Sequence, residues 1–180
     1  MPEHPTRTER FEISLPTVLS LGSNLGDREA IIRAAVAEIA ATSGVTATAA
    51  SSLVETAAHK LGGIDTAAPA YLNAVLMVQT TLRPWELLAA LERIEQQFGR
   101  LRDERWGDRT LDIDIVAMGG LTVNTDHLTI PHPRAADRAF VLVPWLQIDP
   151  DAELAGLGRV DALLAQLDEP VKRLVTEPLL

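Results

Sequence analysis

The sequence lacks several features that would place it in common protein classes. Its 180 residues include no cysteine, so disulfides and thiolate metal sites are excluded and a cytoplasmic location is expected. No apolar run approaches the ~20 residues of a membrane span, so no membrane association is expected. Lysine is scarce, with two against 14 arginines, and the formal net charge is −9. Because nucleic-acid binding needs a basic surface, an acidic chain of this kind is not expected to bind nucleic acid.

The remaining composition is that of one folded domain. Hydrophobic residues make up 47% of the chain and the mean hydropathy is +0.09, which is enough apolar material for a core. The start of the chain, residues 1–16, is polar and contains proline, so we predict a flexible tail rather than a signal peptide. Residues 17–180 are predicted to form a single domain, free-standing and monomeric.

The pattern of apolar residues predicts alternating strands and helices. β-branched runs predict strands and a period of 3.6 predicts helices, giving in chain order a strand over 17–23, a helix over 23–41, strands over 44–56 and 71–81, a helix over 83–99 and a strand over 111–118. This β-α-β-β-α-β order predicts an α+β, ferredoxin-like fold, an antiparallel sheet with helices on one face.

Helix-capping residues and the segments between the elements complete this prediction. We expect Asn24 or Asp27 to cap the first helix, and Pro84 and Gly99 to bound the second. The segments 57–70 and 99–110 are predicted to be long loops, which in small domains tend to be lids or binding loops. The C-terminal extension is predicted to contain one helical turn at 140–146 and a short helix at 160–167.

The stretch "GDRTLDIDI", residues 107–115, raises the question of function. In a strand, residues two apart share a face about 6.6 Å apart at a rise of about 3.3 Å per residue, so Asp112 and Asp114 project together while Leu111, Ile113 and Ile115 enter the core. Two buried like charges are costly, so a cation must offset them. An open, solvated sheet face or pairing with arginines is the simpler alternative for any such pair.

The neighbouring loop favours a phosphate site. Four arginines fall within ten residues just before this strand: Arg100, Arg102, Arg105 and Arg109. Guanidinium groups match phosphate oxygens, and paired carboxylates suit Mg²⁺ that is shared with a substrate phosphate. Together they are typical of a phosphoryl-transfer site. The P-loop and protein-kinase motifs are absent from the sequence, so the common nucleotide-binding frameworks do not apply.

Four blocks of the sequence resemble one enzyme family. They read "SLGSNLGD" (20–27), "YLNAV" (71–75), "ERWGDRTLDIDI" (104–115) and "LTIPHPRAADRAFVLVP" (128–144), in family order. The chain resembles the 6-hydroxymethyl-7,8-dihydropterin pyrophosphokinases of folate biosynthesis. The resemblance implies an α/β/α sandwich fold. It also implies an enzyme that transfers pyrophosphate from ATP, its co-substrate, to the pterin hydroxymethyl group and releases AMP. Two Mg²⁺ ions would be its cofactors.

The resemblance also implies roles for particular residues. Asp112 and Asp114 would bind both metal ions. The pterin would be held by Thr56, Tyr71, Asn73, Trp106 and Phe140, with Asn73 on the ring edge and the aromatic side chains against its faces. Arg102 and Arg105 would act as catalytic lid arginines. The remaining residues implied on the ATP side are Glu92, Glu95, Trp106, Arg109, Ile115, His127, Thr129, His132 and Arg138.

Simpler interpretations of these residues stay open at this point. The aromatic side chains could belong to the core, Asn73 could bridge strands and His132, between two prolines, could be a turn residue. Glu92 and Glu95 could pair with Arg93 or be solvated. The family pattern is interrupted by Ala57-Ala58, by His127 and by a lid one residue shorter than in some relatives.

Two other functional classes compete with pyrophosphoryl transfer. A non-catalytic ferredoxin-like module would show no Mg²⁺-dependent nucleotide binding. A metal-dependent hydrolase would turn over without pterin and release ADP or phosphate rather than AMP. As a hypothesis, the transfer needs no side-chain base, because metal coordination can lower the pKa of the attacking hydroxyl.

Overall fold

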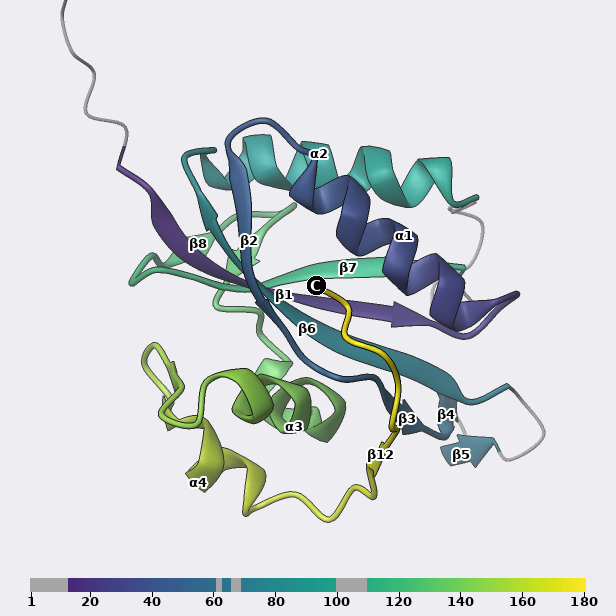
Figure 1. Ribbon diagram of the computed structural model, residues 1–180. Helices are drawn as coiled ribbons and strands as arrows, with labels where there is room; N and C mark the ends of the chain where they lie inside the picture. The colour runs from purple at the N-terminus through teal and green to yellow at the C-terminus, as the bar shows by residue number, and fades with distance from the viewer. Residues whose placement is uncertain (1–12, 61–62, 66–68, 100–109) are drawn as a thin grey trace, which may run out of the picture.

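An antiparallel sheet lies between two helical layers (Figure 1). The computed structural model describes residues 13–60, 63–65, 69–99 and 110–180. Within them the elements are β1 (Leu15–Ser23), α1 (Arg28–Ala40), β2 (Val45–Ala50), β3 (Val54–Thr56), β4 (Ala58–Lys60), β5 (Gly63–Asp65), β6 (Tyr71–Thr80), α2 (Pro84–Gln97), β7 (Asp112–Met118), β8 (Val123–Asn124), β9 (Thr129–Ile130), the 3₁₀ helix η1 (Ala135–Asp137), α3 (Ala139–Ile148), β10 (Glu153–Leu154), β11 (Gly158–Arg159), α4 (Val160–Leu164) and β12 (Lys172–Arg173).

The strand order confirms the ferredoxin-like prediction. The main sheet runs β12-β3-β6-β1-β7, with β2 also paired to β6, and every pairing in it is antiparallel. The two long central strands, β1 and β6, pair from Leu15 opposite Thr80 to Ser23 opposite Leu72. β7 joins the other side of β1 and is an edge strand of this sheet. A ferredoxin-like sheet orders its four core strands in the same way.

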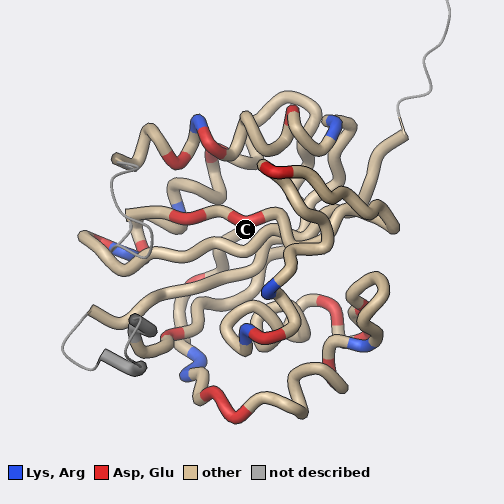
Figure 2. Tube along the Cα trace, turned by 180° about the vertical axis from the view of Figure 1, so that it is seen from behind, with Lys and Arg blue, Asp and Glu red and all other residues tan. Residues whose placement is uncertain are grey.

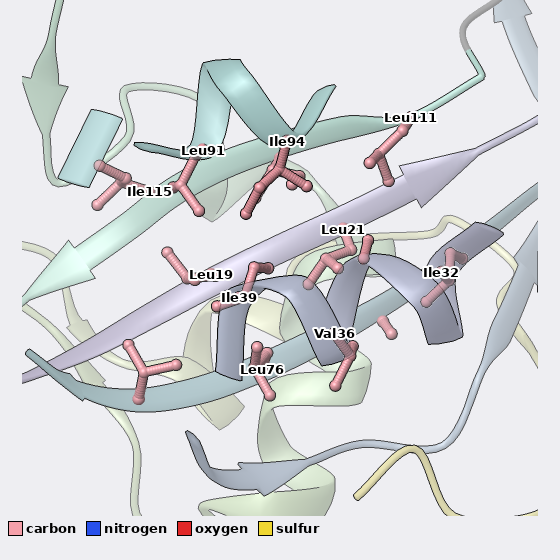
Figure 3. Close-up of a cluster of buried hydrophobic side chains, with 14 of the residues drawn as sticks. Leu19, Leu21, Ile32, Val36, Ile39, Leu76, Leu91, Ile94, Leu111 and Ile115 are labelled. Atoms are coloured by element: carbon pink, nitrogen blue, oxygen red, sulfur yellow. The ribbon is translucent and has the colours of Figure 1, made fainter. Parts of the chain in front are cut away.

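One face of the sheet packs against α1 and α2. Alternate residues of the strands, such as Leu19, Leu21, Leu76 and Ile115, are buried here against the apolar sides of both helices (Figure 3). On α1 the buried positions are Ile32, Ala35, Val36 and Ile39, which recur at helical spacing. Burying a leucine or isoleucine side chain stabilises the fold by about 1.5–3 kcal/mol, so this cluster is a main source of stability.

The opposite face is covered at one end by α3 and α4. Val18, Val75 and Val116 from β1, β6 and β7 pack against Leu142 and Trp145 of α3. The sequence predicted only one helical turn here, at 140–146, because Pro144 interrupts the pattern. The helix in fact spans ten residues, since burial of its apolar side chains outweighs the hydrogen bond that proline cannot donate.

Local signals in the sequence set the helix boundaries as expected. Asp27 is the N-cap of α1, and its Oδ1 accepts a hydrogen bond of 3.1 Å from the backbone N–H of Ala30. Pro84 is the first residue of α2, and Gly99 follows its end with φ +84°. Glycine adopts this left-handed conformation without strain, which is why the helix ends there.

Three strand and loop predictions needed correction. The strand predicted over 44–56 is two strands, because the side chain and backbone of Ser51 bond the peptide of Val75 and interrupt the ladder. The segment 57–70 contains the paired strands β4 and β5, which are too short for alternation to show in the sequence. β1 begins at Leu15, inside the predicted tail, of which residues 1–12 lie outside the described residues.

The last residues return to the sheet. β12 pairs with β3, and the backbone N–H of Leu174 donates to the carbonyl of Leu53 at 2.9 Å. Arg33 of α1 then donates to the carbonyls of Glu177 and Pro178, both at 2.7 Å. Figure 1 shows this final segment, in yellow, crossing in front of the strands toward α1. The C-terminal extension therefore closes the β3 edge of the sheet.

The charge distribution follows the acidic composition. Acidic residues occur on the helices, on the strands and on the loops between them, whereas the blue cationic positions are fewer (Figure 2). Among the described residues, no helix is long and apolar enough to cross a membrane.

Candidate active site

A cavity of about 370 Å³ opens where α3 leaves the face of the sheet uncovered. Its walls come from β1, β3, β6 and β7 on the sheet side and from η1 and α3 on the other side. A glutamate of the C-terminal extension completes them. The lining residues are Ser20, Gly22, Thr56, Ala57, Tyr71, Asn73, Asp112, Asp114, Arg134, Asp137, Arg138, Phe140 and Glu169.

Two carboxylates project into this cavity from β7. Asp112 and Asp114 lie opposite Gly22 and Ser20 of β1, while Ile113 between them is buried on the α1–α2 face. The sheet therefore separates the acidic pair from the core, as the alternation predicted. Small side chains on the facing strand leave room beside both carboxylates, so a ligand can approach them from the cavity.

Two cationic or polar side chains approach Asp114 from the segment before α3. Arg138 Nη1 donates to Asp114 Oδ2 at 3.2 Å, and His132 Nε2 lies 3.7 Å from the same oxygen. Burial, and next the charge of Asp112, raise the pKa of Asp114, while His132 and Arg138 act in the opposite direction. The net rise means that the ionised form of Asp114 is disfavoured in this cavity, and a divalent cation beside it would favour that form.

The imidazole of His132 is held in one orientation. Its Nδ1 accepts a hydrogen bond of 3.1 Å from the backbone N–H of Arg134, and its own backbone N–H donates to the carbonyl of Val116 at 2.9 Å. In the neutral ring the proton must then sit on Nε2, which faces Asp114. Burial lowers the pKa of His132 despite the nearby carboxylate, which favours this neutral form.

The other end of the cavity carries a buried amide. Asn73 is only 3% exposed, and its Nδ2 donates to the Thr56 hydroxyl at 3.2 Å. Gly22 lies opposite Asn73 in the β1–β6 pairing, and a Cβ added there would stand 3.0 Å from Asn73 Oδ1. The glycine thus makes room for the amide. An amide held in this way can recognise a ligand edge that carries both donors and acceptors.

Two aromatic residues also line the cavity. Tyr71 begins β6 and is opposite Thr56 in the β3–β6 pairing, whereas Phe140 comes from α3. The Arg138 guanidinium lies 5.6 Å from the centre of the Phe140 ring. Aromatic walls that come from two different layers suit a flat ring bound between them.

Comparison with known proteins decides the family. The family model described as 7,8-dihydro-6-hydroxymethylpterin-pyrophosphokinase (HPPK) matches residues 18–150, most of the chain. The chain belongs to the HPPK family. It is 42% identical over 130 residues to the Bacillus subtilis 2-amino-4-hydroxy-6-hydroxymethyldihydropteridine pyrophosphokinase, covering 72% of this chain and 75% of the relative. The Mycobacterium bovis protein of the same name is 43% identical over 169 residues, covering 87% and 85%.

Solved structures show the same fold. A structure described as HPPK-DHPS in complex with substrates superposes with a TM-score of 0.64 at 13% identity, covering 85% of this chain and 43% of that one. Plasmodium falciparum HPPK-DHPS gives a TM-score of 0.65 at 15% identity, with 88% and 46% covered. The chain therefore spans less than half of these HPPK-DHPS chains, and at this identity the likeness concerns the fold alone.

The site residues predicted from the sequence differ in where the structure places them. Seven of them line the cavity together: Thr56, Tyr71, Asn73, Asp112, Asp114, Arg138 and Phe140. His132 is not part of this lining, but its Nε2 lies 3.7 Å from Asp114 Oδ2. Arg102, Arg105, Trp106 and Arg109 lie outside the described residues.

The other residues implied on the ATP side are more dispersed. His127 is exposed in the turn between β8 and β9, Thr129 is half-buried in β9, and Glu92 is half-buried on α2. The side chain of Ile115 is 4% exposed and lies in the α1–α2 core, so a contact with ATP could come only from its backbone. Glu95 is 2% exposed and bonds the β7 backbone, so the solvated alternative is wrong for this residue.

Several cavity residues were missed in the sequence. Ser20 and Gly22 face Asp114 and Asp112, and the signal for them was the run of small residues in "SLGS", which needs the β1–β7 register to be interpreted. Glu169 lies in the C-terminal extension, where its Oε2 accepts the backbone N–H of Ala139 at 3.0 Å. No motif in the sequence marks that residue, because its place depends on how the extension returns to α3.

Proposed function

We propose that this cavity is where the HPPK chain transfers pyrophosphate from ATP to the hydroxymethyl group of 6-hydroxymethyl-7,8-dihydropterin and releases AMP, a step of folate biosynthesis. One observation carries this assignment: a pair of carboxylates and a buried amide line the same cavity. Asp112 and Asp114 form its acidic end, and the buried amide of Asn73 marks what we call its amide end; Tyr71 and Phe140 also line the cavity. A phosphate chain and a flat heterocycle can therefore meet within it.

The pterin is held at the amide end in this proposal. Asn73 Oδ1 and the second proton of Nδ2 meet the donor and acceptor edge of the ring, while Thr56 fixes the orientation of the amide. Tyr71 and Phe140 flank the ring faces. Because Asn73 is buried, a ring without the matching edge would leave its amide unpaired at a cost of about 1–3 kcal/mol. That cost makes the amide a source of specificity.

The acidic end fits Mg²⁺. No group of three or more potential ligand side chains gathers in the described part of the chain, so the residues do not form a complete cage there. Mg²⁺ commonly takes one or two carboxylates and completes its shell with water and substrate phosphate. We assign Asp112 and Asp114 as ligands of two such ions. When bound, the ions supply neutralisation of the phosphate charge and lower the pKa of the attacking hydroxyl.

Cationic side chains complete the phosphate end. Arg138 stands beside Asp114 with 20% of its side chain exposed, so it can contact a phosphate oxygen without leaving the carboxylate. Arg102, Arg105 and Arg109 are proposed to reach the triphosphate as the family resemblance implies. Glu92, Trp106, His127 and Thr129 are proposed on the nucleotide side on the same ground.

The bond changes follow from this arrangement. The pterin hydroxyl oxygen attacks the β-phosphorus, a P–O bond forms, the bond from that phosphorus to the oxygen bridging it to the α-phosphate breaks, and AMP leaves. The hydroxyl proton passes to solvent. His132 is not placed as a base, because Nδ1 already accepts a backbone N–H and Nε2–H faces Asp114. The protein's contribution is therefore positioning and electrostatic stabilisation.

One assay tests this proposal. The chain is incubated with ATP, Mg²⁺ and the pterin, and AMP is measured together with the pyrophosphorylated pterin, expected in a one-to-one ratio. Matched reactions omit the pterin, or replace Mg²⁺ with a chelator, and both should yield no AMP. Release of ADP or phosphate without pterin would indicate a hydrolase. Absence of Mg²⁺-dependent nucleotide binding would indicate a non-catalytic module.

We also propose that the chain acts as a monomer. This chain's own residues line the cavity on both its sheet side and its helix side, which supports the proposal. Sedimentation at the concentration of the assay tests this proposal. A dimer whose dissociation abolishes AMP formation would contradict it.

A further inference from the structure

A glutamate of α2 is buried behind the acidic pair. Glu95 is 2% exposed, and its Oε1 accepts a hydrogen bond of 2.7 Å from the backbone N–H of Ile113. Burying a carboxyl group is costly unless it is hydrogen-bonded. A contact retained at that cost calls for an explanation beyond the packing of α2, since methionine or leucine would fill the same space.

The bonded peptide has a special position. Ile113 lies between Asp112 and Asp114, the two residues assigned to the metal ions. On one side β7 pairs with β1, where Ile113 is opposite Leu21. On the other side β7 is an edge of the sheet, so no further strand is there to accept this N–H within the described part of the structure. Glu95 takes the place of that strand at the Asp112–Ile113 peptide, one of the two peptides that join the two ligands.

We propose that Glu95 is a positioning residue for the metal site. By holding the Ile113 N–H it fixes the twist of β7 at this point, and so the spacing and direction of the Asp112 and Asp114 side chains. It acts on the nucleotide site through the backbone and not by contact with ATP. This inference rests on the proposed function, because it takes the two aspartates as ligands of the metal ions that ATP shares.

The test compares two substitutions of similar size. Glu95→Gln keeps an oxygen that can accept the Ile113 N–H, whereas Glu95→Met fills the space without an acceptor. Gln96→Met places the same side chain on the exposed side of α2 and serves as the control. The main readout is the Mg²⁺ concentration that half-saturates binding of a non-hydrolysable ATP analogue, measured by calorimetry. Pterin affinity and thermal unfolding are measured for each variant.

The expected results separate positioning from general damage. Loss of an outer partner of metal ligands typically costs about 10- to 100-fold in metal affinity, so Glu95→Met should raise the Mg²⁺ requirement by about that factor. Glu95→Gln should stay within about threefold of the parent chain, and all variants should keep the parent's pterin affinity. Equal Mg²⁺ requirements for the Met and Gln variants would overturn the inference, as would a loss of pterin binding that accompanies the change.

A measurement on the unaltered chain guards against a variant that fails to fold. The Ile113 amide should exchange with solvent deuterium as slowly as amides inside the β1–β6 ladder, although it lies on an outer edge. Rapid exchange at Ile113 would remove the basis of the inference. If the parent chain instead binds Mg²⁺ and the ATP analogue but forms no AMP, the proposed reaction fails while the role of Glu95 is still decided by the binding data.

Discussion

Gly22 is the position where the smallest change should have the most specific effect. An alanine Cβ there would stand 3.0 Å from Asn73 Oδ1, closer than ordinary van der Waals contact, which begins near 3.4 Å. The amide cannot move freely, because it is 3% exposed and tied to Thr56. We therefore expect Gly22→Ala to displace the Asn73 side chain by a few tenths of an ångström and to weaken pterin binding.

The size of the effect follows from what the amide contributes. Misaligning one buried hydrogen bond and leaving its partner unpaired costs about 1–3 kcal/mol, which corresponds to about a 5- to 150-fold rise in Kd. The fold should not suffer equally. Glycine inside a strand is less favourable than alanine by about 0.5–1 kcal/mol, which offsets part of the local strain. Pterin affinity should therefore fall while the thermal midpoint stays close to that of the parent chain.

Calorimetric titration of the pterin, alongside thermal unfolding, measures both quantities. Gly120→Ala is a matched control, because the added Cβ meets no atom within 4 Å and the residue lacks a left-handed φ. If Gly22→Ala binds pterin within twofold of the control, the close approach of β1 to Asn73 does not shape the pocket, and the assignment of this end of the cavity to the pterin loses its main geometric support.

Further substitutions test other parts of the site. Asp114→Asn should abolish AMP formation yet not lower the metal-free thermal midpoint: its raised pKa means that the ionised carboxyl opposes folding near neutral pH, so a clear drop in midpoint would contradict the electrostatic argument. Glu169→Ala removes the acceptor of the Ala139 N–H at the start of α3 and should reduce the denaturant-derived free energy of unfolding by about 1 kcal/mol, whereas no loss would mean that this bond is not a cap. Arg105→Ala should slow AMP formation far more than it weakens pterin binding; equal losses would count against a lid role.

The sequence was sufficient to predict the fold wherever periodicity and turn residues agreed. Apolar residues at helical spacing in α1, together with Asp27, Pro84 and Gly99, predicted both helices, although α1 begins at Arg28 and not at residue 23. α3 was underestimated because Pro144 lowers local helix propensity, and only the packing of its neighbours against the sheet restores the helix. The break at Ser51 could not be predicted either, since it depends on Val75, 24 residues away.

The site was predictable to the extent that its chemistry lies in short motifs. The alternation of Asp112 and Asp114 with core residues indicated their shared face directly. Gly22 and Glu169 enter the cavity through strand register and through the return of the chain terminus, which no local pattern encodes. The contact of Glu95 with β7 could not be predicted either, because the sequence of a helix does not indicate which of its carboxylates will meet a strand edge.

The alternation of β7 has a consequence for how this family can change. Deleting or inserting one residue within the strand would turn the isoleucines toward the cavity and the carboxylates into the apolar core under α1 and α2. A single-residue change in the sequence before Leu111 would not reverse these faces, provided that Leu111 still enters the core. Insertions and deletions are therefore expected before β7 and not within it.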